Sequence, residues 1–387
     1  MSAPRTGLGE VLETSRVIVS VGPGGVGKTS TSAALALEAA RRGKRVAVLT
    51  IDPARRLANA LGLAEIGSEE RRIDTTAFTA AGLEAPRGVM TAMMLDVHQM
   101  WDDTVRRHHP DPERRERLLQ NRMYQTLSSS LAGSQEYMAM EKLHELASRT
   151  TDKLDLIVLD TPPSAHAMDF LEAPSRLLDA LDNEATRWLI EPFMSRSKRS
   201  SRFFDAGGAM VIRTIGRFTG VETLEALAEL LSGLQDMFDG FRARARAVRA
   251  LLGDTQTSFL IVSAPRPGPI GDARAFHTRL TEERVRVGGF VLNRATVDPF
   301  AGGGAPAPEA LRDAIGRGGG SPELAARIEA LVAEQQETVV VERRLAEALA
   351  HVGAPVWMVP ELPRDVHDLT GLDQIGRASC RERVCYV

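Results

Sequence analysis

One stretch near the beginning of the chain constrains the fold more than any other feature: residues 17–30 read VIVSVGPGGVGKTS. Its first five residues are mostly β-branched and apolar, which is typical of a buried strand, and an alanine-rich helical pattern follows it. The residues between fit G-x-x-x-x-G-K-[ST], in which backbone N–H groups at a helix N-terminus surround phosphate groups. We therefore predict a phosphate-binding loop formed by Gly22, Gly24, Gly25, Val26, Gly27, Lys28, Thr29 and Ser30.

Lys28 and Thr29 bring chemistry that the glycines of this loop lack. The lysine supplies positive charge to the phosphates, and the threonine hydroxyl is a ligand for Mg²⁺. The glycines let the backbone approach the phosphates with positive φ angles. A glycine-rich turn of no function is the alternative, but it would not require a strand directly before it and a helix directly after it.

Two further predicted strands each lead into an aspartate. Residues 45–51 (RVAVLTI) precede Asp52, and residues 154–159 (LDLIVL) precede Asp160. Ligands of open α/β sheets bind at the carboxyl ends of the strands, so both carboxylates can act on a bound phosphate or on its Mg²⁺. Asp52 either orients the attacking water, or contacts Mg²⁺ through its water shell, or caps the following helix. Asp160 fits a Walker-B-type Mg²⁺ position.

The order of these patterns predicts an α/β fold of the P-loop NTPase type, a doubly wound and mostly parallel sheet with a helical insertion subdomain. Helical patterns with mixed charge occupy the segments that we assign to the insertion. The expected division of the 387 residues is 1–97 for the core with the P-loop and first switch, 98–150 for the first part of the insertion, 151–171 for the core with the second switch, 172–254 for the second part of the insertion, 255–373 for the adenine side of the core, and 374–387 for a non-native tail.

The last residues of the chain, 374–387, differ from the rest in their cysteine content and in their sequence. Cys380 and Cys385 are the two cysteines of the chain, so its body has no thiol for disulfide, thiolate–metal or nucleophilic chemistry. The surrounding text QIGRASCRERV resembles the translation of a sequencing adapter. We therefore expect the native sequence to stop near Asp373, and we exclude the tail from the functional reasoning.

The net charge and the hydropathy of the chain limit the classes of partner that we expect. The net charge of −3 gives no general signal for binding a polyanion, so we expect no nucleic-acid partner. Uninterrupted apolar stretches of about 18 residues are lacking, as is an apolar leader at the N-terminus, so we expect a cytoplasmic protein without an integral membrane segment. The adjacent His108 and His109 point about 100° apart on a helix, which favours a solvated face over a shared metal. His166, beyond Asp160, is either near a γ-phosphate or a satisfied core residue.

The motifs together resemble one family. GPGGVGKTS, TIDPARRL, AGSQEYMAMEKL and DTPPSAHAMDFLEAP, in this order and spacing, are similar to the ArsA-like ATPases, which include arsenical pump-driving ATPases and the guided-entry ATPases for tail-anchored membrane proteins. The resemblance continues through residues 257–265, 287–295 and 354–369, so it covers most of the chain. The P-loop alone would indicate only a nucleotide, whereas its combination with the DTPPSAHAMDFLEAP segment is specific.

The resemblance implies an ATPase that uses ATP and Mg²⁺ and works as a dimer whose two nucleotides face each other. It implies that Asp52, Lys28 and Asp160 are catalytic, with Asp52 activating the water and Asp160 in the second switch. Mg²⁺ would be held, partly through water, by Thr29, Asp52 and Asp160. Asn293 would contact adenine beside the loop from Pro360 to Pro363, although an asparagine at a strand end also suits a simple turn.

Two departures from the family pattern matter. Where relatives carry an early P-loop lysine that reaches the partner's phosphates, this chain has Pro23, which offers no charge and no N–H. Arg55, Arg56 or a lysine-bearing paralogue in a heterodimer could supply the missing contact, and we expect hydrolysis to need such help. The cysteines of the arsenite-binding and zinc-clamped branches are absent as well, which weakens both specialised activities.

Two classes of function remain open. The first is an ATP-driven switch that captures or regulates a protein client, for which methionines between Met90 and Met237 form either an apolar groove or plain core. The second is a partition or positioning ATPase acting on membrane or nucleoid, which a large helical insertion does not favour. A kinase that uses the same phosphate-binding loop is a weaker third hypothesis, because the sequence shows no binding motif for a phosphate-accepting substrate. One predicted loop is basic, with Arg196, Lys198, Arg199 and Arg202. Two interpretations of it are open: it contacts phospholipid or an acidic partner, or it is a solvated surface loop.

Overall fold

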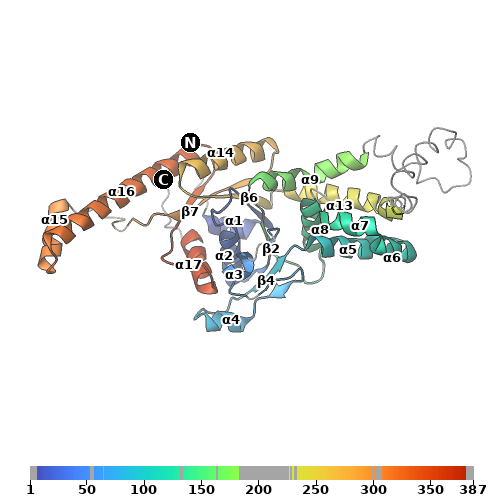
Figure 1. Cartoon of the computed structure of the whole chain (residues 1–387), viewed down its shortest axis with the longest axis horizontal. Coiled ribbons are helices and arrows are strands. Elements are labelled where there is room, and N and C mark those ends of the chain that lie inside the picture. The colour runs from blue at the N-terminus through green and yellow to red at the C-terminus, as the bar shows by residue number, and fades with distance from the viewer. Residues whose placement is uncertain are drawn as a thin grey trace, which may run out of the picture.

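The fold is known from a computed structural model (Figure 1). It describes residues 7–52, 56–63, 65–130, 134–162, 164–182, 226, 229–230, 233–298, 300 and 307–380. The basic loop of residues 195–202, together with Met194 and Met210, lies outside these residues, so the interpretations made for them stay predictions. Among the described residues, no helix combines the length and the apolar character that crossing a membrane requires.

An eight-stranded sheet forms the centre, in the order β3-β4-β2-β5-β1-β6-β7-β8. The pairs from β4 to β8 are parallel, and the edge strand β3 pairs antiparallel with β4. The central position of β1 follows from its composition, because all five of its residues are buried between β5 and β6. The strands are β1 Val17–Val21, β2 Arg45–Thr50, β3 Arg71–Arg72, β4 Val89–Met94, β5 Leu156–Asp160, β6 Thr257–Ser263, β7 Val287–Ala295 and β8 Val356–Pro360.

Helices cover both faces of the sheet, so the predicted doubly wound, mostly parallel α/β architecture is confirmed. Alternate residues of β1 point into different cores: Val17, Val19 and Val21 into one, Ile18 into the other. On the Ile18 side lie α1 Leu8–Thr14, α2 Lys28–Arg41, α3 Arg56–Ala60, α4 Thr75–Ala80 and α17 Leu369–Cys380. On the other side lie α8 Ser134–Ala147, α9 Ser164–Asp182, α14 Pro267–Glu282 and α16 Pro322–Ala350.

A helical subdomain extends from one end of the sheet (Figure 1). Its members are α5 Val97–His108, α6 Pro112–Gln120, α7 Arg122–Ser130 and α13 Phe238–Leu252. It has its own small core around Val105, Leu118, Tyr124 and Phe241. Six methionines between Met90 and Met237 are buried, which supports plain core over an apolar groove for those six: Met90, Met93, Met100, Met138, Met140 and Met237.

One local expectation, the solvated face at His109, is wrong. His109 is buried, and its ring is hydrogen-bonded to the backbone of Asp111, so it belongs to the packed corner between α5 and α6 and not to a solvated face. The glycine- and proline-rich segment after Asp298 contains a helix, α15 Pro308–Arg317, which packs on α16 to form an arm that extends away from the sheet (Figure 1). Pro308 at the helix start explains this, since proline is well suited to the first turn.

The C-terminal helix runs through the segment that we predict to be non-native. Within α17, Leu372 and Ile375 are buried against α2, and Asp373 forms ion pairs with Arg41 and Arg377. Ile375 also lines the cavity described below. Leu372 and Asp373 belong to the part of α17 that we expect to be native, whereas Ile375 and Arg377 lie beyond it.

Candidate functional site

The loop between β1 and α2 has the backbone that a phosphate-binding loop requires. Gly22 has a φ of +146°, and a Cβ atom there would lie 2.0 Å from the carbonyl oxygen of Val262 in β6, so no larger residue fits. Gly27 has a φ of +91° and is the N-cap of α2, with no side chain capping the helix. The first N–H groups of α2 therefore remain available for an anion, as the helix dipole favours.

Lys28 is folded back over its own loop. Its Nζ atom donates to the carbonyl oxygens of Gly22 and Pro23, each at 2.9 Å. The side chain is largely buried, and this burial lowers the pKa of Lys28, although the nearby Asp160 carboxylate acts in the opposite direction. The lysine is thus held at the mouth of the loop by two neutral acceptors that a phosphate group could replace.

Asp160 ends β5 directly behind Thr29. Its Oδ2 accepts hydrogen bonds from the hydroxyls of Thr29 at 2.8 Å and Thr50 at 2.9 Å, while its Oδ1 is buried without a hydrogen-bond partner among the described residues. Complete burial raises the pKa of Asp160 to about 6, against the effect of both hydroxyls and of Lys28. A buried carboxylate oxygen with no partner is costly unless a ligand or water satisfies it.

This donor set fits Mg²⁺. The ion prefers oxygen ligands, one or two of them carboxylates, and keeps several waters. The Thr29 hydroxyl and the free Asp160 Oδ1 are oxygens of this kind, and they lie side by side beneath the phosphate-binding loop. Thr29 and Asp160 are the residues that would hold the ion, with Asp52 near enough to interact electrostatically with both Asp160 and Lys28.

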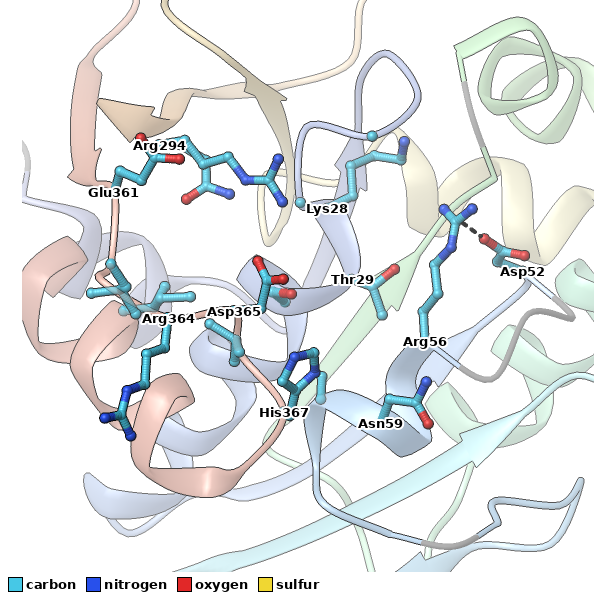
Figure 2. Close-up of a pocket in the computed structure, with 18 of the residues that line it drawn as sticks. Lys28, Thr29, Asp52, Arg56, Asn59, Arg294, Glu361, Arg364, Asp365 and His367 are labelled. Carbon is cyan, nitrogen blue, oxygen red and sulfur yellow. Dashed lines mark ion pairs between the residues drawn. The ribbon is translucent and has the colours of Figure 1, made fainter. Parts of the chain in front are cut away.

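Asp52 follows β2 and forms an ion pair with Arg56 at 3.4 Å (Figure 2). The Arg56 side chain is 59% exposed and the Asp52 side chain 16%. Figure 2 shows both side chains beside Thr29, on the same side of the loop as Lys28. The pair therefore places an exposed cation at the cavity, next to the end of β2.

A cavity of about 380 Å³ opens above these groups, a volume in the usual range for a small-molecule site. It lies at the carboxyl edge of the parallel strands, as expected for an open α/β sheet. Eight of the predicted site residues line it: Gly25, Gly27, Lys28, Thr29, Ser30, Asp52, Asn293 and Pro360. The other predicted residues do not line it: Gly22, Gly24, Val26 and Asp160.

Asn293 at the end of β7 supports the loop. Its Nδ2 donates to the carbonyl oxygen of Val26 at 2.9 Å, and a Cβ atom on Gly27 would lie 2.2 Å from the same Nδ2. Gly27 is therefore required both by its φ angle and by the close approach of Asn293. In this conformation the amide faces the P-loop and also borders the cavity, so the predicted contact with adenine stays a prediction.

Some lining residues of the cavity belong to earlier expectations: Arg56 of α3, and Glu361 and Leu362 within the predicted loop from Pro360 to Pro363 (Figure 2). The lining residues that were not predicted are Asn59, Arg294, Arg364, Asp365, Val366 and His367. Thr50, which donates to Asp160, was also missed. The sequence carried no signal for these residues, because their approach to the cavity depends on which loops the topology brings together.

The sequence of this chain is similar to those of known ATPases. The family model described as anion-transporting ATPase matches residues 15–300, a span that contains the P-loop, both aspartates and Asn293. The ATPase get3 of Aspergillus terreus is 30% identical over 226 residues. A protein of the same name from Aspergillus niger is 29% identical over 226 residues. Each match covers 58% of this chain and 58% of the relative's own length.

Proposed function

Because this chain belongs to the anion-transporting ATPase family, whose model matches residues 15–300, we propose that it binds ATP with Mg²⁺ in the cavity and hydrolyses the nucleotide. The observation that carries the proposal is Asp160, a buried carboxylate with one oxygen held by Thr29 and Thr50 and the other without a partner. That arrangement suits a divalent cation next to a phosphate-binding loop. Mg²⁺, when bound, would neutralise charge that develops on the phosphate oxygens.

The protein groups have separate roles in this proposal. The backbone N–H groups at the start of α2 bind phosphate oxygens, and Lys28 exchanges the carbonyls of Gly22 and Pro23 for phosphate. Asp52 accepts a hydrogen bond from the attacking water and orients it in line with the terminal phosphate. In hydrolysis the water oxygen bonds to the terminal phosphorus as the bond from that phosphorus to the bridging oxygen breaks. ADP leaves with the bridging oxygen, and the proton lost by the water passes to the released phosphate.

Arg56 is the cation that we propose for the role left open by Pro23. Its guanidinium is more than half exposed, borders the cavity and already contacts a carboxylate, so it can turn to a phosphate oxygen at small cost. Cations aimed at the transferring phosphate stabilise the transition state, where its charge is redistributed. Lys28 alone does not replace this contact, since it is committed to the P-loop side of the phosphates.

We propose that the nucleotide state reaches the helical subdomain through α8. Gln135 in the first turn of α8 donates to the carbonyl oxygen of Ile51, the residue before Asp52. Further along α8, Glu141 pairs with Arg244 of α13 at 2.5 Å. A shift of the Asp52 loop on ATP binding would therefore move α8 and, with it, α13. Such coupling fits a dimeric switch, formed as a homodimer or with a paralogue, that captures or regulates a protein client, hydrophobic clients included.

The proposal is tested with variants of the three central groups. Lys28→Ala should abolish binding of a fluorescent ATP analogue, Asp160→Asn should remove the Mg²⁺ dependence of binding, and Asp52→Asn should keep binding but lower phosphate release at least about a hundredfold. Lys153→Ala, which changes an exposed lysine remote from the cavity, is the matched control. Nucleotide binding by Lys28→Ala at the wild-type affinity would contradict the assignment of the site.

A further inference from the structure

The orientation of α16 on the body is fixed by its inward face. Glu342 accepts from the backbone N–H and the hydroxyl of Thr296, at 2.7 and 2.9 Å, and Arg343 pairs with Asp298 at 2.9 Å. Val339 and Ala346 are buried beside them. These contacts prevent rotation of the helix about its axis, so the residues on its opposite face are presented to the outside.

That outward face carries an ordered stripe of exposed residues: Ala333, Glu337, Val340, Val341, Arg344 and Ala348. At about 100° per residue, the six fall within a sector of about 100°. Val340 and Val341 are each 43% exposed and belong to the few exposed large apolar residues in the described part of the chain. Leu324 and Leu331, nearer the N-terminus of α16, are also exposed, but at about 100° per residue they lie outside this sector and do not belong to the stripe.

The two charges of the stripe are left without partners. Glu337 and Arg344 are seven residues apart, about 10.5 Å along the helix, which is too far for a mutual ion pair. Neither side chain has an ion pair or a hydrogen bond with another described residue. Neither charge has an oppositely charged neighbour four residues further along or back. Val341 lies four residues after Glu337, and Val340 and Ala348 lie four residues before and after Arg344.

The stripe is self-complementary when its direction is reversed. The spacing from Ala333 to Ala348 is the same in both directions, and reversal exchanges Glu337 with Arg344. We propose that a second copy of this chain docks on this face with the two α16 helices antiparallel. The two-fold axis passes between Val340 and Val341, so that Glu337 of each copy meets Arg344 of the other and the valines of both copies pack around the axis.

This contact goes beyond the proposed ATPase function and is separate from its site. The outward face of α16 lies on the opposite side of the sheet from α2 and α17, which border the cavity. It would therefore form without nucleotide. Two helices touching over residues 333–348 bury less than the roughly 1,200 Å² of total surface at which specific stable interfaces begin, so we expect a reversible contact that adds to any nucleotide-linked dimer.

Charge exchange tests the contact on the full chain without nucleotide. Glu337→Arg and Arg344→Glu each place like charges against each other twice, and each should weaken dimerisation about tenfold in sedimentation equilibrium. The double variant Glu337→Arg/Arg344→Glu restores opposite charges and should return to the wild-type constant. Glu69→Arg makes the same charge change at an exposed position away from α16 and should have no effect. A double variant as weak as the single ones would overturn the proposal.

Orientation is tested by cross-linking in a Cys380→Ser/Cys385→Ser background. A mixture of Glu337→Cys and Arg344→Cys proteins should form a disulfide-linked heterodimer on mild oxidation, and at least about fivefold less of either homodimer, because only unlike positions meet in the antiparallel arrangement. Preferential homodimers would indicate a parallel contact. A wild-type chain that stays monomeric up to about 0.5 mM without nucleotide would also overturn the proposal. Binding of a fluorescent ATP analogue, unchanged in every variant, shows that the fold is intact.

Discussion

At the scale of single residues, Asp160 is the group whose environment differs most from that of an ordinary aspartate. It is fully buried, two hydroxyls hold one oxygen, and the other oxygen has no hydrogen-bond partner among the described residues. The protein stabilises the charged form only in part, so the pKa is raised to about 6. A buried carboxylate of this kind is stabilised strongly by a bound cation. Binding of the cation requires loss of the carboxyl proton, so ion binding and proton release are coupled at Asp160.

The first prediction concerns pH. A folded-state pKa above the unfolded value means that the folded protein binds this proton more tightly, so the Asp160 contribution to stability increases as the pH falls through 6. Between pH 7 and pH 5 the gain is about 1 kcal/mol for the nucleotide-free protein. The measurement is urea unfolding of wild type and Asp160→Asn at both values, with exposed Asp239→Asn as the control. Equal pH dependence in wild type and Asp160→Asn would contradict the assignment.

Mg²⁺-dependent nucleotide binding should have the opposite pH dependence. The ion requires the deprotonated carboxylate, so affinity in the presence of Mg²⁺ should decline as the pH is lowered from 7 to 5, by about tenfold if one proton is displaced. Titration of a fluorescent ATP analogue at several pH values measures this. Affinity without Mg²⁺ is the reference series, and parallel declines in the two series would argue against Asp160 as the linked group.

Arg56 carries the third residue-scale prediction. Arg56→Ala should lower phosphate release about tenfold to a hundredfold while nucleotide affinity changes by less than about threefold, because the contact is made mainly in the transition state. Arg56→Lys should retain part of the rate. Arg72→Ala, at an exposed position of β3, is the matched control. Loss of affinity in proportion to the loss of rate would instead indicate that Arg56 contributes uniform binding.

At the scale of elements, the patterns of apolar residues predicted the sheet well. The strands predicted at 17–21, 45–51 and 154–159 are all observed, as Val17–Val21, Arg45–Thr50 and Leu156–Asp160. These segments are long or fully buried, so their periodicity dominates local preferences. The two-residue strand β3 and the short helix α4 were not foreseen, since each depends on pairing with β4 and on packing at the sheet edge.

The site was less predictable than the fold. The P-loop and the two aspartates follow from motif and strand ends, whereas Thr50, Asn59 and His367 approach the cavity only through the chain topology. The burial of His109 was missed for a related reason, because Asp236 and the segment before α13 are distant in sequence but lie within 3.8 Å of its ring. Sequence periodicity contains no information on contacts between segments that are distant in sequence.

The pairing of α8 with α13 gives an element-scale prediction. Glu141 and Arg244 are both nearly buried, and burial raises the pKa of Glu141 although Arg244 acts in the opposite direction. Arg244→Ala should destabilise the protein by about 3 kcal/mol, because it leaves a buried carboxylate without its partner. Arg45→Ala, whose partner Asp152 is 82% exposed, should cost less than about 1 kcal/mol. Urea unfolding followed by circular dichroism measures both, and equal costs would contradict a buried pair.

At the scale of the whole molecule, Pro23 stands where the family resemblance predicts a lysine that would reach across a dimer. Pro23 is buried and contributes only its carbonyl, which Lys28 occupies. We predict slow ATP turnover for the chain alone and at least about tenfold faster turnover with a paralogue that carries the early lysine. Phosphate release by each protein alone and by the mixture is the measurement. Lys28→Ala in this chain shows which subunit's site is stimulated, and fast turnover by the lone chain would refute the requirement.

The contact of Lys28 with the carbonyls of Gly22 and Pro23 has a consequence for nucleotide exchange. These two carbonyls are partners for the lysine that belong to the loop itself, so the loop does not need to be organised by the incoming phosphate. Arrival of nucleotide is then an exchange of hydrogen-bond partners within a preformed cradle, with little conformational entropy to lose. Departure is assisted by the same carbonyls, which recapture the lysine as the phosphate leaves, and a loop of this kind favours rapid release over tight retention.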